Sequence, residues 1–366
     1  MKKHYLLISF TVILLSFTCI DIFTKDKAFS EFENRKLSEK VNFTVKDFID
    51  GSFQEDYESY VNDQFILRDK WINLKSISEY ALGKIENNGI IYGDNNYLFE
   101  KFDKFNRERL EKNINSIKLF SEKYKDLVSF MIVPSSYEIY KENLPIGSPV
   151  IEQEYIVNNI YKQLNSSKNI NVFNILKENK NNYIYYKTDH HWTSYGAYLA
   201  YCGFINSINE SKVDINTLNK IDLYDFYGTY FSKAKPFNIK GDILTYFELK
   251  NITMDIGENH YNTIYDFSKI ENRDKYSLFL NGNNGLTVIK NNNLNNGKRI
   301  LVIKDSFANS FIPFLTYNYE EIHVIDLRHY VYDLSKYIDQ NNFDNILVLY
   351  NFINLCTDNN LIKIKY

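Results

Sequence analysis

The sequence predicts an α/β fold organised around a doubly wound, mainly parallel sheet. Residues 127–133 and 300–303 are continuous apolar runs, which are typical of parallel strands covered by helices on both faces. In the second half of the chain such runs alternate with segments whose apolar residues follow the helical period. Repeated strand–helix–strand units imply parallel strands joined by right-handed crossovers, and 366 residues suffice for one large domain of this kind with appendages.

The individual elements follow from the spacing of apolar residues and from turn sequences. Helical spacing between residues 45 and 85 predicts two helices, which we expect to form an amino-terminal cap. A hairpin is expected at 89–99, because apolar runs flank the turn at 93–96. The remaining expected elements are helix 107–124, strand 126–133, helix 151–164, strand 170–176, strand 183–188, helix 194–208, strand 276–280, strand 300–303, helix 306–315, strand 322–325, helix 331–338 and strand 346–349.

We expect the chain to have three parts. Residues 1–23 form a signal-anchor or signal peptide, residues 24–85 form a linker and the helical cap, and residues 86–366 form the main domain. Residues 212–297 interrupt the alternation of strands and helices with Asn/Gly turns, so we expect them to form a mostly β insertion in that domain.

The amino terminus has the pattern of an export signal. Lys2 and Lys3 precede an uncharged stretch from Tyr5 to Ile20, which Asp21 closes. No small-x-small cleavage site follows cleanly, so an uncleaved signal-anchor is favoured over a cleaved signal peptide. In both cases the positive-inside rule places the rest of the chain outside the cytoplasm, either membrane-anchored or secreted.

Composition excludes some classes of function. A formal net charge of −3 gives no electrostatic basis for nucleic-acid binding, which usually shows a basic stripe. Cys19, Cys202 and Cys356 have no paired spacing, so neither a disulfide framework nor a zinc knuckle is expected.

An acid and two imidazoles stand together at Asp189, His190 and His191. They follow the β-rich run 183–188, so we expect them at the carboxyl end of a strand, where open α/β sheets present their chemistry. In an extended segment residues i and i+2 point to the same side, so Asp189 reaches His191 while His190 points away. We expect His191 to act as the general base and Asp189 to orient it. His190 is left with a structural hydrogen bond or a substrate contact.

Ser306 follows the apolar strand that ends at Ile303 and precedes a helical pattern. A serine at a strand-to-helix turn gains exposure and nearby backbone donors, as a nucleophile requires. Locally a helix N-cap is an equally good interpretation, and the Asp-x-His pair elsewhere favours the nucleophile. In that case the N–H groups of Ser306, Phe307 and Ala308 are expected to contribute to an oxyanion hole.

Weaker candidates for contact with the substrate or the oxyanion are His190, Asn309, Arg328, Tyr137 and Asn283. Asn309 lies one helical turn beyond the serine, and is either a hydrogen-bond donor to the oxyanion or an ordinary helix-surface residue. Arg328 falls at the end of the next strand. Its expected role there is either to orient a donor substrate or an anionic sugar, or to form a salt bridge with Asp326 or Asp305.

Metal binding by the run 189–191 is the competing chemistry, and a wholly structural role is a further alternative. Adjacent histidines on a strand diverge, and the other histidines show no ligand spacing such as H-E-x-x-H. We therefore expect neither a metal nor a cofactor.

These segments resemble the DHHW-motif family, which is named for the tetrapeptide at 189–192. The two most specific elements are Thr188-Asp189-His190-His191-Trp192-Thr193 and Lys304-Asp305-Ser306-Phe307-Ala308-Asn309-Ser310. Further matching elements are Glu33-Asn34-Arg35, Asn62-Asp63-Gln64-Phe65 with Arg68-Asp69, Asn88-Gly89-Ile90, Tyr137-Glu138-Ile139-Tyr140 before Leu144-Pro145, and Asp326-Leu327-Arg328.

This family is similar to the extracytoplasmic alginate O-acetylation proteins, whose catalytic domain looks like an SGNH hydrolase. The resemblance implies an SGNH hydrolase-like three-layer sandwich with Asp189, His191 and Ser306 as acid, base and nucleophile. It also implies transfer of acetyl groups to a polysaccharide, with a membrane-bound O-acyltransferase supplying acetyl from inside. The chain ends soon after the core sheet, without the separate carbohydrate-binding module of the alginate proteins, so the acceptor glycan stays open.

We therefore expect an extracytoplasmic O-acetyltransferase that modifies a cell-surface polysaccharide through a Ser-His-Asp acyl-enzyme. A carbohydrate acetylesterase uses the same acyl-enzyme and resolves it with water, so exclusion of water decides between the two. The third hypothesis is a non-catalytic, glycan-binding scaffold of an acyltransferase complex.

Overall fold

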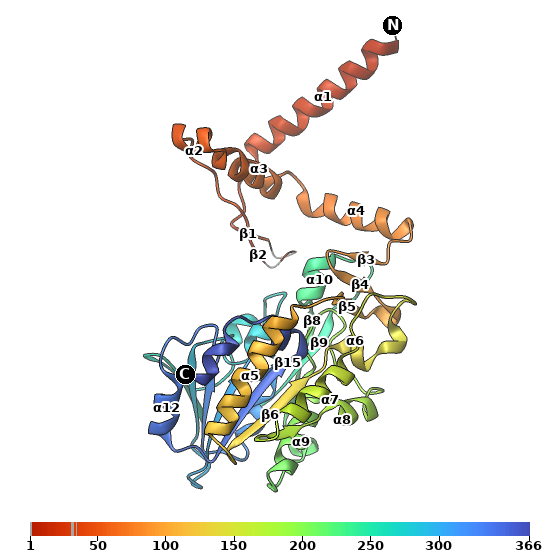
Figure 1. Cartoon of the computed structure of the whole chain (residues 1–366). Coiled ribbons are helices and arrows are strands. Elements are labelled where there is room, and N and C mark those ends of the chain that lie inside the picture. Colours follow the sequence, from red (N-terminus) through yellow and green to blue (C-terminus); the bar gives the residue numbers. More distant parts are fainter. Residues whose placement is uncertain (1, 31–32, 34) are drawn as a thin grey trace. The chain divides into compact units, whose positions relative to one another are not determined.

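The computed structural model describes residues 2–30, 33 and 35–366, and the chain divides into two compact units. The first unit comprises Met1–Lys84 and Ser232–Ile239, and the second comprises Ile85–Phe231 and Lys240–Tyr366 (Figure 1).

The first unit is mainly helical. Its elements are α1 (Lys2–Phe23), β1 (Phe29–Ser30), β2 (Arg35–Lys36), α2 (Val45–Asp50), α3 (Ser52–Gln64) and α4 (Arg68–Ala81), and it also takes the last residues of α10 (Thr229–Ala234). Thr44 caps α2 by accepting a hydrogen bond from the Asp47 N–H at 3.1 Å. Two helices were predicted between residues 45 and 85, whereas the structure has three, because Gly51, with a φ of 88°, ends α2 before α3 begins.

Charged residues of the sequence motifs near the amino terminus lie together in this unit. The buried carboxylate of Asp63 accepts hydrogen bonds from both terminal nitrogens of Arg35, at 2.8 and 2.5 Å. Glu33 forms ion pairs with Arg35 at 2.8 Å and with Arg68 at 2.7 Å. Asn34 lies outside the described residues. The motif residues therefore connect β2, α3 and α4 through charge-assisted bonds.

Helix α1 is the one helix in the described part of the chain that is long and apolar enough to cross a membrane. Its stretch His4–Phe23 has a mean hydropathy of 2.3, and none of this stretch is buried inside the protein. A signal sequence near the amino terminus has the same properties, so α1 fits either a signal or an anchor.

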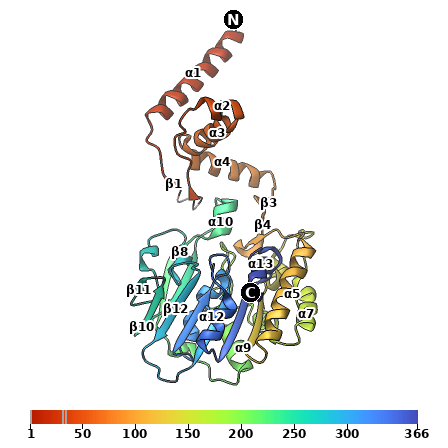
Figure 2. The ribbon, with the colours of Figure 1, turned by 60° about the vertical axis from the view of Figure 1, so that its left-hand side comes forward.

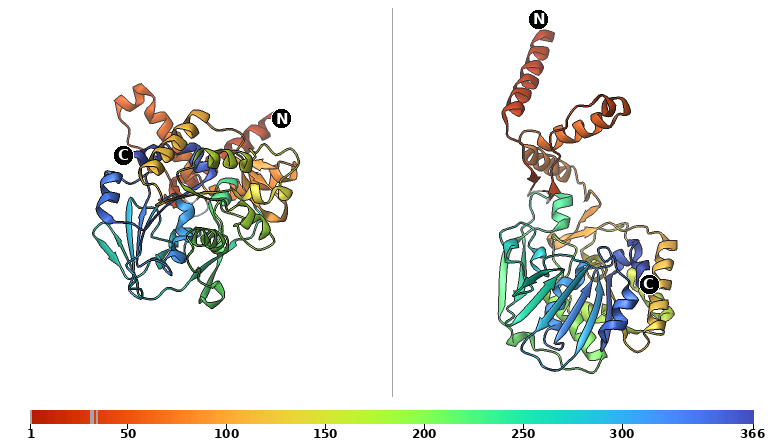
Figure 3. Two further views of the ribbon diagram at one scale, coloured as in Figure 1. Left: turned by 60° about the horizontal axis from the view of Figure 1, so that its bottom comes forward. Right: turned by 90° about the vertical axis from the view of Figure 1, so that its left-hand side faces the viewer.

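The second unit is built on a large mixed sheet of eight strands, which Figures 2 and 3 show from several sides. In spatial order the strands are β11 (Asn259–Tyr261), β10 (Ile252–Ile256), β12 (Leu286–Asn291), β14 (Glu321–Ile325), β13 (Arg299–Lys304), β15 (Asn345–Asn351), β6 (Val128–Val133) and β7 (Lys168–Ile170). The pairs from β14 to β7 are parallel, whereas β12, β10 and β11 pair in antiparallel fashion. The predicted α/β class is confirmed; the sheet, expected to be mainly parallel, is mixed, with parallel pairs from β14 to β7 and antiparallel pairs beyond β14.

Helices and two smaller sheets complete this unit. Figures 1 and 2 both show α5 beside the sheet, where α5 packs against α13. The helices are α5 (Arg107–Lys123), α6 (Ser136–Ile139), α7 (Gln153–Gln163), α8 (Phe173–Glu178), α9 (Ser194–Ser207), α11 (Ile312–Leu315), α12 (Leu334–Asn341) and α13 (Phe352–Thr357). The small sheets contain β3 (Glu86–Asn87), β4 (Ile90–Tyr92) and β5 (Leu98–Glu100), and β8 (Lys220–Phe226) and β9 (Asp242–Phe247). The 3₁₀ helices are η1 (Asp94–Asn96), η2 (Lys141–Asn143), η3 (Ile215–Thr217), η4 (Phe267–Lys269), η5 (Tyr276–Leu278), η6 (Ser306–Ser310) and η7 (Leu361–Lys365).

Three predicted strands are wrong, each for a local reason. In place of a strand at 170–176, α8 begins after Asn171, whose side chain accepts from the Phe173 N–H at 3.0 Å and turns the chain. In place of a strand at 276–280, the chain forms η5 and then bends at Leu280, whose φ is 59°. The run 183–188 forms only an isolated bridge, because the N–H groups of its last two residues donate to the Asp242 carboxylate at 2.9 and 2.8 Å.

Gly196 permits the close approach of α9 to the segment before the Asp-His-His-Trp run. Thr193 caps the helix by accepting a hydrogen bond from the Gly196 N–H at 3.2 Å. A Cβ atom at Gly196 would lie 2.3 Å from the backbone oxygen of Ile184, which cannot move independently. The absence of a side chain at this position therefore fixes where α9 starts relative to the run.

Replacement of Gly196 with Ala is expected to lower the free energy of unfolding by about 2 kcal/mol or more, because the backbone clash outweighs the better helix propensity of Ala. Gly203→Ala in the same helix is the control, since its Cβ would meet side-chain atoms alone, the end of Ile175 at 3.1 Å and Ile170 at 3.8 Å. Urea denaturation followed by tryptophan fluorescence measures both variants. Equal stability of the two variants would contradict the packing argument.

Candidate active site

The strand β13 carries Ser306 to the carboxyl edge of the parallel part of the sheet. The preceding residue, Asp305, is buried and caps η6, with Oδ1 accepting from the Phe307 N–H at 3.0 Å. Its Oδ2 accepts from the Asn351 N–H and from Asn354 Nδ2, both at 2.7 Å. Asp305 thus fixes the turn at Ser306 to the end of the neighbouring strand β15.

Trp192 holds the second segment of the site against this turn. The segment forms a loop closed by a single antiparallel bridge between Tyr185 and Trp192. The Trp192 indole N–H donates to the backbone oxygen of Phe307 at 2.9 Å and to Ser310 Oγ at 3.1 Å. Since the Trp192 side chain is fully buried, the loop and η6 form one packed body.

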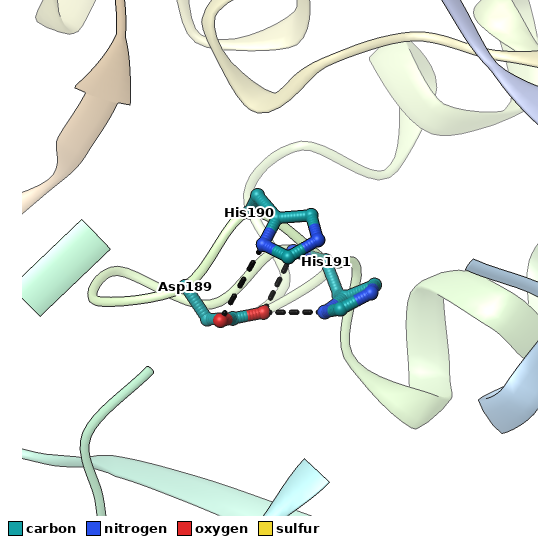
Figure 4. Close-up of side chains that lie close together, drawn as sticks. All are labelled: Asp189, His190 and His191. Atoms are coloured by element: carbon teal, nitrogen blue, oxygen red, sulfur yellow. Dashed lines mark hydrogen bonds and ion pairs between the residues drawn. The ribbon is translucent and has the colours of Figure 1, made fainter. Parts of the chain in front are cut away.

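Asp189, His191 and Ser306 form a continuous hydrogen-bonded chain, although Asp189 and Ser306 belong to distant segments. His191 Nε2 lies 2.8 Å from Ser306 Oγ, across 115 positions of sequence. His191 Nδ1 lies 2.5 Å from Asp189 Oδ1, which also accepts from the His191 N–H at 3.0 Å (Figure 4). Asp189 and His191 are buried, whereas Ser306 is partly exposed.

The second oxygen of the Asp189 carboxylate is held by Thr229, which sequence analysis did not single out. Asp189 Oδ2 accepts from the Thr229 N–H at 2.8 Å and lies 3.1 Å from Thr229 Oγ1. Gly228 allows this approach, because a Cβ there would lie 2.2 Å from that of Asp189. The same Thr229 hydroxyl lies 2.7 Å from His190 Nδ1. Nothing in the local sequence marks Thr229, since it is brought to the site by the long segment after α9.

Burial and mutual charge set the protonation of these groups. Burial, together with repulsion from His190, lowers the pKa of His191 to about 4 despite the attraction of Asp189. Burial alone would raise the pKa of Asp189, but the two imidazoles hold it well below its usual range. At neutral pH the site therefore pairs a charged carboxylate with a neutral His191, which is the form that accepts a proton.

The backbone donors at the turn differ from those expected. The N–H of Phe307 is taken by the Asp305 side chain and that of Ala308 by the Asp305 backbone oxygen, at 3.0 and 3.2 Å. Among the described residues no acceptor contacts the Ser306 N–H. The expectation for Phe307 and Ala308 is wrong because Asp305 uses both groups, and the Ser306 N–H is the donor that the turn leaves for an oxyanion.

Asn309 and Asn283 lie together around a buried lysine. Lys304 Nζ donates to Asn283 Oδ1 at 2.6 Å and to Asn309 Oδ1 at 2.7 Å. Asn309 Nδ2 is turned towards Asn283 Oδ1, at 3.2 Å. Burial lowers the pKa of Lys304 to about 8. The structure brings these amides together, where their oxygens accept hydrogen bonds from the buried ammonium, and Asp326 Oδ2, at 3.7 Å from Lys304 Nζ, supplies the opposite charge.

Arg328 and Tyr137 have different surroundings. Arg328 forms a bidentate pair with Asp326, Nε to Oδ1 at 2.9 Å and Nη2 to Oδ2 at 2.5 Å, so the structure has the salt bridge that was one alternative for this residue. Tyr137 is buried in α6, and burial raises the pKa of its hydroxyl. It lines a cavity of about 500 Å³ together with Glu138 and residues 141–142, 144–148 and 150–152.

Ligand atoms of Asp189, His190 and His191 lie within 4.8 Å of one another, which is the spacing of a possible metal site. Each of these groups has a protein partner in the arrangement described above, and Ser306 Oγ stands in line with His191 Nε2. A hydroxyl, an imidazole and a carboxylate hydrogen-bonded in this order have the geometry that nucleophilic catalysis by a serine requires.

Comparison with solved structures shows a shared fold. A DHHW family protein from Eubacterium siraeum superposes with a TM-score of 0.67 at 23% identity, covering 77% of this chain and 96% of the other. PatB1 from Bacillus cereus superposes with a TM-score of 0.62 at 25% identity, covering 75% and 99%. The O-acetyltransferase domain of AlgJ from Pseudomonas putida is more distant, with a TM-score of 0.47 at 13% identity over 76% and 98%.

None of the curated proteins compared with the chain matches it. A family model described as "DHHW protein" matches residues 76–325, a range that contains the Asp-His-His-Trp run and the turn at Ser306. The resemblance expected from the sequence motifs is therefore confirmed. The chain belongs to the DHHW family.

Proposed function

We propose that this protein is an extracytoplasmic O-acetyltransferase that acetylates hydroxyl groups of a cell-surface polysaccharide through an acetyl–Ser306 intermediate. The observation that carries the proposal is the continuous chain Ser306 Oγ–His191 Nε2–His191 Nδ1–Asp189 Oδ1, with separations of 2.8 and 2.5 Å between side chains. The resemblance of the motifs to alginate O-acetylation proteins supports acetyl as the group and a glycan as the acceptor.

In the first half-reaction Ser306 Oγ attacks the carbonyl carbon of an acetyl ester while its proton passes to His191 Nε2. Asp189 stabilises the imidazolium that forms, and the Ser306 N–H donates to the carbonyl oxygen as it gains charge. The bond to the leaving alcohol then breaks, and the His191 proton passes to the leaving oxygen. The products are acetyl–Ser306 and the free alcohol.

In the second half-reaction a sugar hydroxyl replaces the leaving alcohol. Its proton passes to His191 as its oxygen bonds to the acetyl carbon, and Ser306 Oγ leaves with the proton returned by His191. An acetylesterase would use water at this step, so the competition between water and the sugar decides the activity. A non-catalytic glycan-binding scaffold remains the alternative from another class, in which Ser306 is unreactive.

Helix α1 supports an extracytoplasmic location, as either an anchor or a signal. In the proposal the acetyl donor is delivered across the membrane by a membrane-bound O-acyltransferase. An activated acetyl ester replaces that partner in a test with purified protein.

Ser306→Ala and His191→Ala are each expected to lower acetyl transfer from an activated ester to an oligosaccharide by roughly 10³-fold or more, because each removes a member of the proton-transfer chain. His190→Ala is expected to cost only about tenfold, the equivalent of roughly one hydrogen bond. Acetylated oligosaccharide is quantified by mass spectrometry.

His260→Ala provides the matched control for these variants. His260 forms a similar pair with Asp255, Nδ1 to Oδ1 at 2.6 Å, but this pair is exposed. Its removal should leave acetyl transfer within about twofold of the wild type. A dispensable His191 beside an essential His190 would overturn the assignment of the base.

The pH dependence of kcat/KM for the ester should follow the protonation of His191. Because burial and His190 lower its pKa to about 4, the imidazole is neutral above that pH, so activity should rise through pH 4 and then stay level towards neutrality. Tryptophan fluorescence at each pH identifies acid unfolding. A rise centred at or above the ordinary histidine value of about 6.5 in folded protein would show that His191 is not the buried base.

A further inference from the structure

We propose that Tyr276 is a positioning residue that holds the general base His191 in register with the nucleophile Ser306. The inference rests on the proposed acyl-transfer chemistry of this site. Neither the sequence motifs nor the comparisons assign a role to Tyr276, which belongs to the segment expected to form the β insertion. It is the one described residue that both stacks on the His191 ring and hydrogen-bonds the backbone of Ser306.

The phenol ring of Tyr276 covers one face of the base. Its centroid lies 3.7 Å from that of His191, and the two rings are inclined by only 9°. The His190 ring has its centroid at the same distance, inclined by 37°. Two rings this close cannot share one face of an imidazole, so His191 lies between them. Rotation of its ring away from Ser306 is therefore blocked on both sides.

The hydroxyl of Tyr276 reaches the nucleophile turn. It donates to the backbone oxygen of Ser306 at 2.9 Å and lies 3.2 Å from Ser310 Oγ, which also accepts from the Trp192 indole. One side chain thus contacts the base with its ring and the nucleophile with its hydroxyl. A shift of either segment would break one of these contacts.

Tyr276 is itself held firmly. The residue is 6% exposed, and its N–H donates to Asp274 Oδ1 at 3.2 Å. The neighbouring Lys275 Nζ donates to the backbone oxygens of Ile270 and Asn272 at 2.7 and 2.8 Å, which fixes the loop before η5. The tyrosine therefore acts as a fixed support rather than as an adaptable contact.

The stacked ring also suits the chemistry of the base. The ring keeps water from the face of His191 that it covers, and burial is the main reason why the pKa of His191 is lowered. Loss of the ring is therefore expected to change both the rate and the pH at which the base becomes active.

The test measures how fast Ser306 reacts with a sulfonyl fluoride, as a function of pH. In this reaction Ser306 Oγ bonds to sulfur, fluoride leaves and His191 takes the proton, so no acetyl donor or glycan is involved. Tyr276→Leu, which removes ring and hydroxyl, should react at least about 100-fold more slowly, with its inflection moved up from about 4 towards 6.5. Tyr276→Phe, which keeps the ring, should react about tenfold more slowly with an unchanged inflection.

Tyr265→Phe is the matched control, because Tyr265 is also buried and its hydroxyl also donates to a backbone oxygen, that of Phe247 at 2.8 Å. It should lose stability as Tyr276→Phe does and keep the wild-type reaction rate within about twofold. Circular dichroism reports folding, and if Tyr276→Leu does not fold, the comparison of the two Phe variants decides.

Wild-type rates and inflection in the Tyr276 variants would overturn the inference, as would a wild-type protein that is not sulfonylated at Ser306. Sulfonylation of the wild type that is slowed in the Tyr276 variants as predicted, without acetylation of any oligosaccharide, would instead contradict the proposed function while supporting the role of Tyr276.

Discussion

The whole site depends on the contact between the Trp192 indole and the backbone of η6. This buried N–H joins two segments that are far apart in the chain, and it holds the loop that carries His191 against the turn that carries Ser306. A buried indole without an acceptor is costly, so the loop cannot move away without leaving a polar group unsatisfied. Trp192, the residue after the two histidines, therefore has a structural role of its own in the site.

The charge distribution at the site depends on one carboxylate, that of Asp189, whose two oxygens both accept hydrogen bonds. Asp189 is buried, and its two oxygens are divided between His191 on one side and Thr229 on the other. A charged carboxylate in this environment persists only because each oxygen has donors. It can then stabilise an imidazolium at the moment of proton transfer, while His191 stays neutral at rest.

Local sequence was sufficient for part of this arrangement. The apolar run before Ser306 predicted a buried strand that delivers a serine at its end, and the structure has this strand, β13. Asp189 faces His191 at 2.5 Å, as predicted. The extended segment assumed for this prediction is absent, however, and His190, which was expected to point away, lies beside both residues, with Nδ1 3.6 Å from Asp189 Oδ2. The strand depends on short-range periodicity, which a single sequence records directly, whereas the position of His190 depends on the bend that replaces the expected strand.

The remaining features depend on long-range contacts, for which a single sequence has no signal. Thr229 and Tyr276 reach the site from the long segment after α9, part of which also supplies the antiparallel strands of the sheet. The prediction that the Phe307 N–H would contribute to an oxyanion hole was wrong for a related reason. The Asp305 side chain accepts from this N–H, which an uncapped helix start would leave free. Tertiary context decided each of these points.

The most direct test of the account is intact-mass and peptide-level mass spectrometry after brief exposure of the protein to an acetyl ester and acid quenching. The account predicts a mass increase of about 42 Da, the size of one acetyl group, on the peptide that contains Ser306, and no increase in Ser306→Ala. Folded wild-type protein that gains no acetyl group, or gains it at another residue, would contradict it.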